Sequence, residues 1–318
     1  MLNRRHLRIK VMQALYSYFQ TGNKDIVRGE KELRSSVLRV YDLYISLLHL
    51  LLEIQDQSTK ILNDAKNKRL PTALDLMPNL RFVNNEIFTI FSTNTQLKRE
   101  TNNRKITWQT EDELVRKIIT QIKAGPEFKI YEELPEDEFT FDVQKQFIIN
   151  MFKNYICDFE LLGDYFEQRS IYWVDDLRLV NHAIIKTIEG LQWPHQPEDI
   201  ILLPLFKDEL EDQQFLVDLY RKCILFAPDF EKIISDKTTN WEVERIAMMD
   251  ILLMKMALTE ILHFDNIPVK VTLNEYIEIS KLYSSPKSKV FINGILDKLV
   301  ADFKVNEKIQ KTGRGLCD

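Results

Sequence analysis

The residue types that most often carry enzymatic chemistry are scarce in this sequence and form no usable group. The histidines are widely separated, and no two lie four residues apart as they would in a helical zinc site: His6, His49, His182, His195 and His263. The cysteines form no C-x-x-C pair: Cys157, Cys223 and Cys317. The only G-x-G, Gly313-Arg314-Gly315, lies in a polar tail with no helix expected after it, so it does not predict a phosphate-binding loop. We therefore predict no catalytic site, no metal and no cofactor, and expect a binding protein.

Positive charge is concentrated at the beginning of the chain. Arg4, Arg5, Arg8 and Lys10 precede the first acidic residue, Asp25. The apolar spacing in this segment predicts a helix, and cations in the first turn of a helix oppose its dipole at a cost of roughly a few tenths of a kcal/mol each. Binding of an anionic partner would explain these cations. A solvated chain end and an amphipathic mitochondrial presequence are the alternatives that remain open.

The composition favours a helical protein of the cytoplasm. Only 8 glycines and 10 prolines occur in 318 residues, fewer than an α/β enzyme with many turns would need. The net charge of -5 argues against a wholly basic nucleic-acid coat, so any contact with nucleic acid must come from a local patch. The scattered cysteines suit a reducing compartment. The longest apolar run, residues 44–54, is far shorter than the roughly 20 residues of a membrane span, so no membrane contact is expected.

Apolar residues recur at helical spacing along most of the chain, which predicts an all-α fold. The pattern predicts helices over residues 4–20, 30–65, 175–189, 215–225, 229–234, 241–263, 271–282 and 287–303. The charged stretches 98–105 and 132–142 are expected to be loops. Prolines at 194, 197 and 204 mark a junction. We therefore predict two domains, 1–205 with the first helix and an expanded helical region, and 206–318 with a C-terminal helical bundle.

Two separated groups of short blocks carry the most specific pattern in the chain. The N-terminal group is Arg4-Arg5-His6-Leu7-Arg8 followed by Gln13-Ala14-Leu15-Tyr16-Ser17. The C-terminal group has Leu273-Asn274-Glu275 and Phe291-Ile292-Asn293-Gly294 as its most specific blocks. In order and spacing these blocks closely resemble the bacterial transcription antitermination family NusB. The resemblance covers roughly residues 3–20 and 213–305, about a third of the chain, and residues 25–205 have no clear counterpart.

The resemblance implies a fold, a function and a set of partners. The fold would be an all-α, NusB-like helical bundle with an enlarged helical N-terminal and middle region. The function would be non-enzymatic: transcription antitermination by binding single-stranded boxA-type RNA together with NusE, a small-subunit ribosomal protein, in support of ribosomal RNA transcription. RNA polymerase in its elongation complex would be an indirect partner. The RNA surface requires that the two ends of the chain pack together.

The resemblance also implies particular site residues. By their places in the motifs, Arg4, Arg5, Arg8, Tyr16 and Phe291 would contact RNA. Arginines bind phosphates, and exposed aromatic rings stack on unpaired bases, so these residue types suit single-stranded RNA. Asp250 falls where the family places an acid that faces NusE.

The chain departs from the family pattern after Tyr283. Ser284 stands where a small residue or glycine is usual, and Lys287 stands where some members carry an acid. Because Lys287 adds a cation near Phe291, it joins the predicted RNA-binding residues.

Two other functions stay open from the sequence. An RNA cytosine-5 methyltransferase is one, because some of these enzymes carry a NusB-like N-terminal domain. Neither a Gly-rich cofactor loop nor a catalytic cysteine context supports it here. A helical module that binds only proteins is the other, with the charged stretches 98–105 and 132–142 as its candidate surfaces.

Overall fold

The structure of the chain, a computed structural model, describes residues 1–22, 25–238 and 247–316. Every regular element in these ranges is a helix, so the predicted all-α class is confirmed for them. None of the described helices is long and apolar enough to cross a lipid bilayer. The chain forms two compact units. We call Leu38–Leu205 with Met1 the middle unit, and Leu2–Val37 with Phe206–Asp318 the terminal unit.

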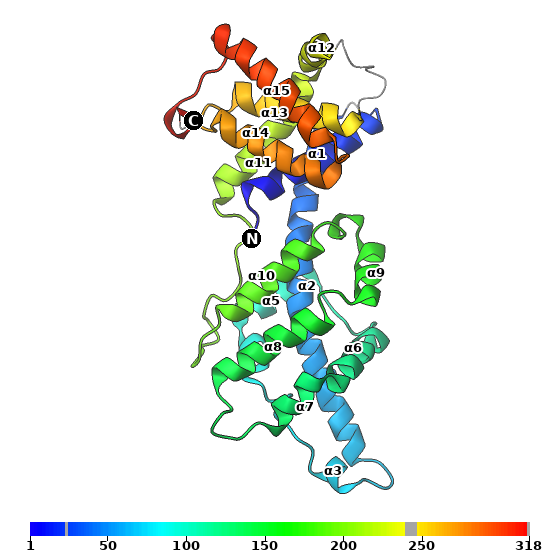
Figure 1. Cartoon of the computed structure of the whole chain (residues 1–318). Coiled ribbons are helices and arrows are strands. Elements are labelled where there is room, and N and C mark those ends of the chain that lie inside the picture. Colours follow the sequence, from blue (N-terminus) through cyan, green and yellow to red (C-terminus); the bar gives the residue numbers. More distant parts are fainter. Residues whose placement is uncertain (23–24, 239–246, 317–318) are drawn as a thin grey trace. The chain divides into compact units, whose positions relative to one another are not determined.

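The terminal unit is a bundle built from both ends of the chain (Figure 1). Its elements are α1 (Arg4–Gln20), the first turns of α2 (Ile26–Lys66), α11 (Glu209–Leu225), α12 (Ala227–Lys237), α13 (Met248–His263), α14 (Val269–Tyr283), α15 (Ser288–Val305) and the short η3 (Gly313–Leu316). Helix α13 is central and packs against α1, α11, α12, α14 and α15. Because neighbours surround it, every residue from Leu252 to Ile261 is buried.

Helix α1 begins and ends at the predicted residues. Asn3 and His6 form a capping box at its start: the Asn3 side chain accepts from the His6 N–H at 3.0 Å, and His6 Nδ1 accepts from the Asn3 N–H at 3.3 Å. The helix buries Leu7, Val11 and Leu15 against the bundle. Residues 2–37, which the sequence pattern assigns to the 1–205 domain, therefore belong to the same unit as the C-terminal helices. The two ends of the chain pack together.

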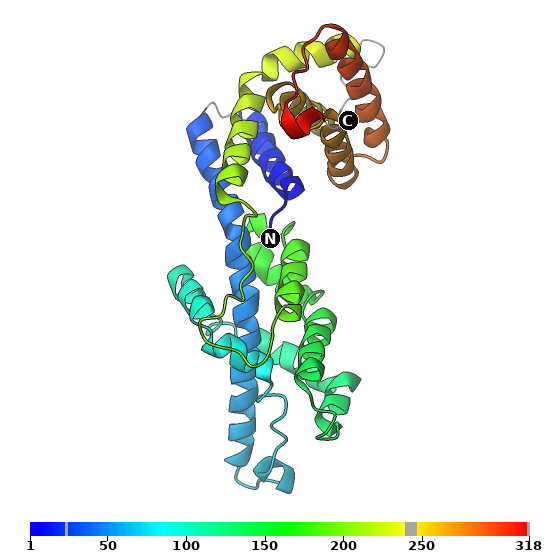
Figure 2. The same cartoon turned by 90° about the vertical axis from the view of Figure 1, so that its left-hand side faces the viewer.

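The middle unit contains the rest of α2 and a series of shorter helices (Figure 2). These are α3 (Ala73–Leu76), α4 (Glu86–Thr93), α5 (Thr95–Arg104), α6 (Asp112–Ala124), α7 (Pro126–Glu133), α8 (Phe141–Tyr155), α9 (Glu160–Arg169), η1 (Ile171–Trp173) and α10 (Leu177–Glu189). Several hydrogen bonds tie α2 to this set; for example, Trp108 Nε1 donates to the Ser46 carbonyl at 3.0 Å, and the Tyr44 hydroxyl lies 2.6 Å from Thr187 Oγ1. Aromatic rings fill the core, with Tyr131 stacked on Phe147 at 3.8 Å between centroids.

The predicted loops and one predicted helix differ from the structure. The stretch 98–105 was expected to be a loop, but all of it except Lys105 lies in α5, because Asn94 caps this helix and Leu97 and Thr101 are buried beneath it. The acidic stretch 132–142 is partly helical, since α7 ends at Glu133 and α8 begins at Phe141. The helix predicted over 241–263 is described from Met248 onward, and residues 241–246 lie outside the described residues.

Candidate nucleic-acid interface

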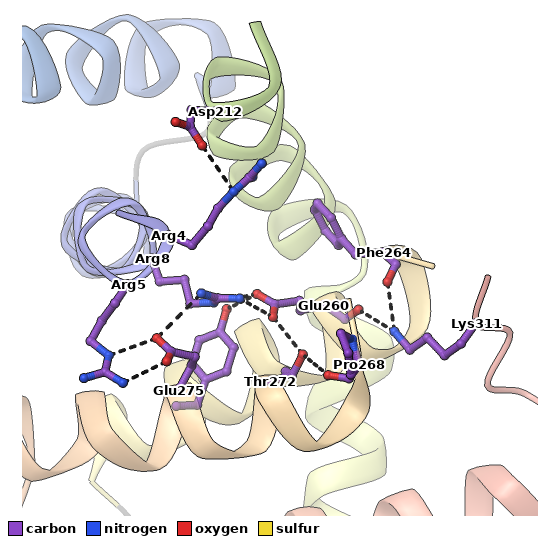
Figure 3. A network of polar contacts seen from close by, with 11 residues as sticks. Arg4, Arg5, Arg8, Asp212, Glu260, Phe264, Pro268, Thr272, Glu275 and Lys311 are labelled. Carbon is purple, nitrogen blue, oxygen red and sulfur yellow. Dashed lines mark hydrogen bonds and ion pairs between the residues drawn. The ribbon is translucent and has the colours of Figure 1, made fainter. Parts of the chain in front are cut away.

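A buried ion pair joins α1 to the centre of the terminal unit. Arg8 Nε and Nη2 donate to the two carboxylate oxygens of Glu260 at 2.8 and 2.6 Å, and the side chains are 3% and 0% exposed (Figure 3). Thr272 Oγ1 donates to the same carboxylate at 2.7 Å. Burial alone would lower the pKa of Arg8, but the neighbouring Glu260 carboxylate raises it above its usual value, so the pair remains charged. Arg8 was predicted to contact RNA; in this structure its side chain is almost wholly buried, and its guanidinium is paired with Glu260.

Arg4 and Arg5 lie nearer to the surface of the same unit. Arg5 Nε and Nη2 donate to Glu275 at 2.9 and 2.8 Å, and the hydrogen bond with this carboxylate raises the pKa of Arg5. Arg4 Nη2 lies 2.6 Å from Glu211 Oε1, and its Nε lies 3.2 Å from Asp212 Oδ1. The side chains of Arg4 and Arg5 are 31% and 41% exposed. These two arginines are therefore paired but accessible.

The geometry of these pairs leaves donors available at the surface. A guanidinium carries five N–H donors in a planar fork. In the described part of the chain, the pairs of Arg4 and of Arg5 engage Nε and Nη2. The Nη1 group of each can therefore donate to a phosphate without breaking the existing ion pair.

The three arginines border an open groove with a volume of about 1140 Å³. Its other walls come from α11, from the connection between α13 and α14, and from the C-terminal tail. Cations lie over aromatic rings in two of these walls: Arg4 is 4.4 Å from the centre of the Phe215 ring, and Lys222 Nζ is 4.8 Å from that of Phe264. Such a surface can hold the backbone of a nucleic acid through charge, with apolar ring edges beside it.

Carboxylates share this groove with the cations. Glu211, Asp218, Asp265 and Glu275 also line it. Each acid weakens the attraction of a phosphate to its cationic neighbours, so the groove is not a strongly positive surface. A polyanion bound there would be held by a few specific contacts, and its affinity would depend on the cations that have no carboxylate partner.

The remaining predicted RNA-binding residues lie away from the groove. Tyr16, on α1, is 37% exposed, and its hydroxyl accepts a hydrogen bond from Gln20 Nε2 at 3.1 Å. Phe291 on α15 is half-buried, and Lys287 at the N-terminal cap of α15 is exposed. None of these three is among the described residues that line the groove. Tyr16 on α1 and Phe291 on α15 belong to the same unit, because both helices pack on α13 and α14.

Asp250, predicted to face a protein partner, is buried near the start of α13. It is 5% exposed, and its two carboxylate oxygens accept hydrogen bonds from Ser284 Oγ at 2.5 Å and Ser288 Oγ at 2.8 Å. These bonds hold the connection between α14 and α15. The Asp250 carboxylate is therefore engaged inside the unit and is not exposed to a partner in this structure.

The sequence did not indicate which acids pair with the three arginines. Asp212 shares α11 with three other acids and Glu260 shares α13 with Asp250, and nothing in their spacing relates them to residues 4–8. Glu275 belongs to the block Leu273-Asn274-Glu275, but the block does not indicate that its carboxylate pairs with Arg5. Phe215 and Lys222 could have been noticed as an aromatic residue and a cation at helical spacing on α11.

Comparisons with known proteins show the family of the chain. The model of the NusB family matches residues 198–301, which include α11 to α14 and most of α15. A transcription antitermination protein NusB from Salinibacter ruber is 38% identical over 117 residues, which are 37% of this chain and 72% of the relative. The protein of the same name from Chloroherpeton thalassium is 37% identical over 122 residues, 38% of this chain and 55% of the relative.

A third relative of the same name, from Alkaliphilus oremlandii, is 36% identical over 98 residues, 30% of this chain and 71% of the relative. No solved structure matches the chain significantly. The family match begins after the last helix of the middle unit, so it does not extend to α3–α10. All three relatives are transcription antitermination proteins.

Proposed function

The chain belongs to the NusB family of transcription antitermination proteins, and from this premise we propose that it binds single-stranded boxA-type RNA together with NusE and supports ribosomal RNA transcription. RNA polymerase in its elongation complex would be reached through these partners. The observation that carries the proposal is the groove of the terminal unit, where the partly exposed Arg4 and Arg5 keep an Nη1 group outside their ion pairs. Guanidinium groups with unused N–H donors are the usual contacts of nucleic-acid phosphates.

The predicted RNA-binding residues take different parts in this proposal. Arg4 and Arg5 would contact phosphates directly, because their side chains are partly exposed. Arg8 would act as a positioning residue, because its buried pair with Glu260 fixes the first turns of α1 against α13. Tyr16, Phe291 and Lys287 would contact RNA beyond the groove, with the rings stacking on bases and the ammonium attracting phosphate.

The proposed contact with NusE involves Asp250 indirectly. Since its carboxylate is occupied by Ser284 and Ser288, Asp250 would shape the connection between α14 and α15 that a protein partner could contact. Replacing Asp250 by Ala would then loosen this connection and weaken NusE binding even though the carboxylate itself stays inside the unit. Isothermal titration of the variant with purified NusE, compared with the unchanged protein, measures this effect.

RNA binding is tested by titrating a short fluorescently labelled single-stranded RNA with a boxA-type sequence at several salt concentrations. We expect the logarithm of the binding constant to fall linearly with the logarithm of the salt concentration. The double variant Arg4→Ala with Arg5→Ala should show a shallower slope. The slope should decrease by roughly 0.7 for each phosphate contact that is lost. A double variant that retains its helical circular dichroism, the unchanged affinity and the unchanged slope would contradict the proposal.

A specific feature of the middle unit supports a second candidate function, contact with another protein. Large apolar side chains gather in residues 70–77 with little cover: Leu70 is 86%, Leu74 is 81% and Met77 is 84% exposed. Isolated exposed apolar residues are ordinary, but several together in one short segment are typical of a contact surface. Purification with and without ribonuclease separates the two candidates, because a partner held only through RNA is lost when the RNA is digested.

A further inference from the structure

The C-terminal tail after α15 is built into the terminal unit as a fixed wall of the groove. Two positive backbone φ angles turn the chain back toward the bundle, 54° at Glu307 and 52° at Gly313. The returning segment reaches the connection between α13 and α14, where the Thr312 N–H donates to the Asp265 carbonyl at 3.0 Å. Ile309 packs on a core cluster of Ile261, Val269 and Val300.

Two further contacts fix the tail at this place. Lys311 Nζ donates to the carbonyls of Phe264 at 2.9 Å and Glu260 at 3.4 Å, where the last carbonyls of α13 lack partners within the helix (Figure 3). Gly315 is buried so closely that a Cβ atom there would lie 1.9 Å from the Asp265 carbonyl oxygen. Only glycine fits at this contact. The motif Gly313-Arg314-Gly315 is therefore a docking segment for the tail, in which one glycine turns the chain and the other permits close approach.

This docking brings Arg314 to the groove. Arg314 and Thr312 line it together with Arg4, Arg5 and Lys222. Arg314 is exposed, and within the described residues it has no ion pair or hydrogen bond. The three arginines of α1 each face at least one carboxylate, so Arg314 differs from them in carrying an uncompensated charge. An unpaired guanidinium can offer a phosphate two parallel donors without giving up an existing partner.

We propose that Arg314 is a phosphate-binding residue of the RNA groove and that the docked tail exists to hold it there. This inference rests on the proposed function, because the phosphate belongs to an RNA strand lying in the groove. It assigns a binding role to a segment that the family match, which ends at residue 301, does not include. The tail wall would add one phosphate contact to those made by Arg4 and Arg5.

The test uses the full chain and the short labelled single-stranded RNA at several salt concentrations. Arg314→Ala should weaken binding several-fold and reduce the salt slope by roughly 0.7, the value for one lost phosphate contact to a single strand. Arg314→Lys should restore most of the slope, because it keeps the charge. Lys298→Ala is the matched control, since Lys298 is an exposed cation on α15 that does not line the groove, and it should leave both quantities nearly unchanged.

Gly315→Ala tests whether the position of the Arg314 charge matters, and not only its presence in the chain. This variant keeps every charge, but its added Cβ must push the tail from the Asp265 carbonyl. We expect it to lose as much RNA affinity as Arg314→Ala does. Should Gly315→Ala fail to fold, the comparison of Arg314→Ala, Arg314→Lys and Lys298→Ala still decides the question.

The outcomes distinguish this inference from the proposed function. If the Arg4 and Arg5 double variant weakens binding while Arg314→Ala behaves like Lys298→Ala, the inference on the tail is overturned and the RNA groove stands. If the unchanged protein does not bind the RNA, both proposals fail together. Equal losses for Arg314→Ala and Gly315→Ala, with no loss for Lys298→Ala, would support the tail as a wall of the binding site.

Discussion

The two units of the chain differ in the number of charged side chains that they bury. In the terminal unit these charged residues are less than a tenth exposed: Arg8, Lys10, Glu30, Asp212, Asp250, Lys255 and Glu260. In the described residues of the middle unit, only Glu53 and Asp176 are charged and buried to the same degree. Removing a charge from water costs several kcal/mol unless a partner compensates it. Of these residues Arg8 lines the groove, and Asp212 and Glu260 pair with the arginines of α1 that line it.

Neutral groups hold the interior of the middle unit instead. Asn85 is 0% exposed and donates to the Tyr131 hydroxyl at 2.8 Å and to the Gln144 carbonyl at 3.2 Å. Asn94, also 0% exposed, donates to the carbonyls of Pro197 and Asp199 at 3.2 and 2.9 Å. Each of these amides also caps a helix. These bonds join neighbouring segments of the middle unit without any charged group, so changes in the two units should have different consequences.

Glu260→Ala should have the largest effect on stability, and it tests whether the terminal unit depends on its buried charges. The variant leaves the buried Arg8 guanidinium without its main partner, which should cost about 3–5 kcal/mol of the free energy of unfolding of the terminal unit. Calorimetry of the full chain measures it, because two units can unfold in separate transitions. Glu260→Gln, which keeps an acceptor for Thr272, should cost less. A loss below about 1 kcal/mol for Glu260→Ala would show that the pair behaves like an exposed salt bridge.

Asn85→Ala should have the next largest effect, confined to the middle unit. It removes the cap of α4 and leaves the Gln144 carbonyl and the Tyr131 hydroxyl without this donor, which should cost roughly 1–3 kcal/mol. RNA affinity in the fluorescence titration should not change. Asn103→Ala, at an exposed position of α5, is the matched control. Weakened RNA binding by folded Asn85→Ala would break the division of roles between the units.

Glu275→Gln, in the terminal unit, should increase RNA affinity a few-fold. It removes the carboxylate that competes with phosphate for Arg5, while the amide oxygen can still accept a hydrogen bond. Glu278→Gln on the same helix removes the same charge without touching the Arg5 pair, so it measures the general electrostatic effect. Equal increases for the two variants would show that pairing with Glu275 does not limit binding by Arg5.

The smallest expected effect is on the pH dependence of stability, through the cap of α1 at His6. Burial, and then the nearby Arg5, lower the pKa of His6, so the folded state binds fewer protons at this group than the unfolded state does. The neutral ring is the form that accepts from the Asn3 N–H. Stability from this group is therefore present above the unfolded pKa of about 6.5 and is lost as pH falls through the lower folded pKa. Thermal unfolding at descending pH should show a dependence that His6→Gln reduces, and an identical profile for this variant would contradict it.

Much of the fold could be predicted because local residue spacing determines it. The periodic apolar residues gave the bounds of α1 and, within a few residues, those of α10, α12, α14 and α15. Helix α5 was missed because its sequence is almost wholly polar and only two of its residues, Leu97 and Thr101, are buried. Its stability comes from the rest of the middle unit and from the Asn94 cap, neither of which a local pattern contains.

The candidate site was predictable in its residue types but not in its arrangement. The arginines at 4, 5 and 8 and the family blocks near the C-terminus indicated an RNA-binding protein with a surface at its two ends. The tail motif at 313–315 was discounted, because the need for glycine at Gly315 depends on a carbonyl that is distant in sequence. Contacts between distant segments arise from packing and leave no local periodicity.

The sequence alone determined the helical class, the family and the presence of a cationic first helix, since these depend on composition, spacing and short motifs. Only the tertiary structure decided which partner each cation has and how far it is buried. Arg4, Arg5 and Arg8 are alike in the sequence, but Arg8 meets Glu260 in the interior, Arg5 meets Glu275 at the rim, and Arg314 reaches the same groove from the other end of the chain. The physical reason is that burial and pairing of a charge depend on neighbours brought by the fold, and these lie hundreds of residues away along the chain.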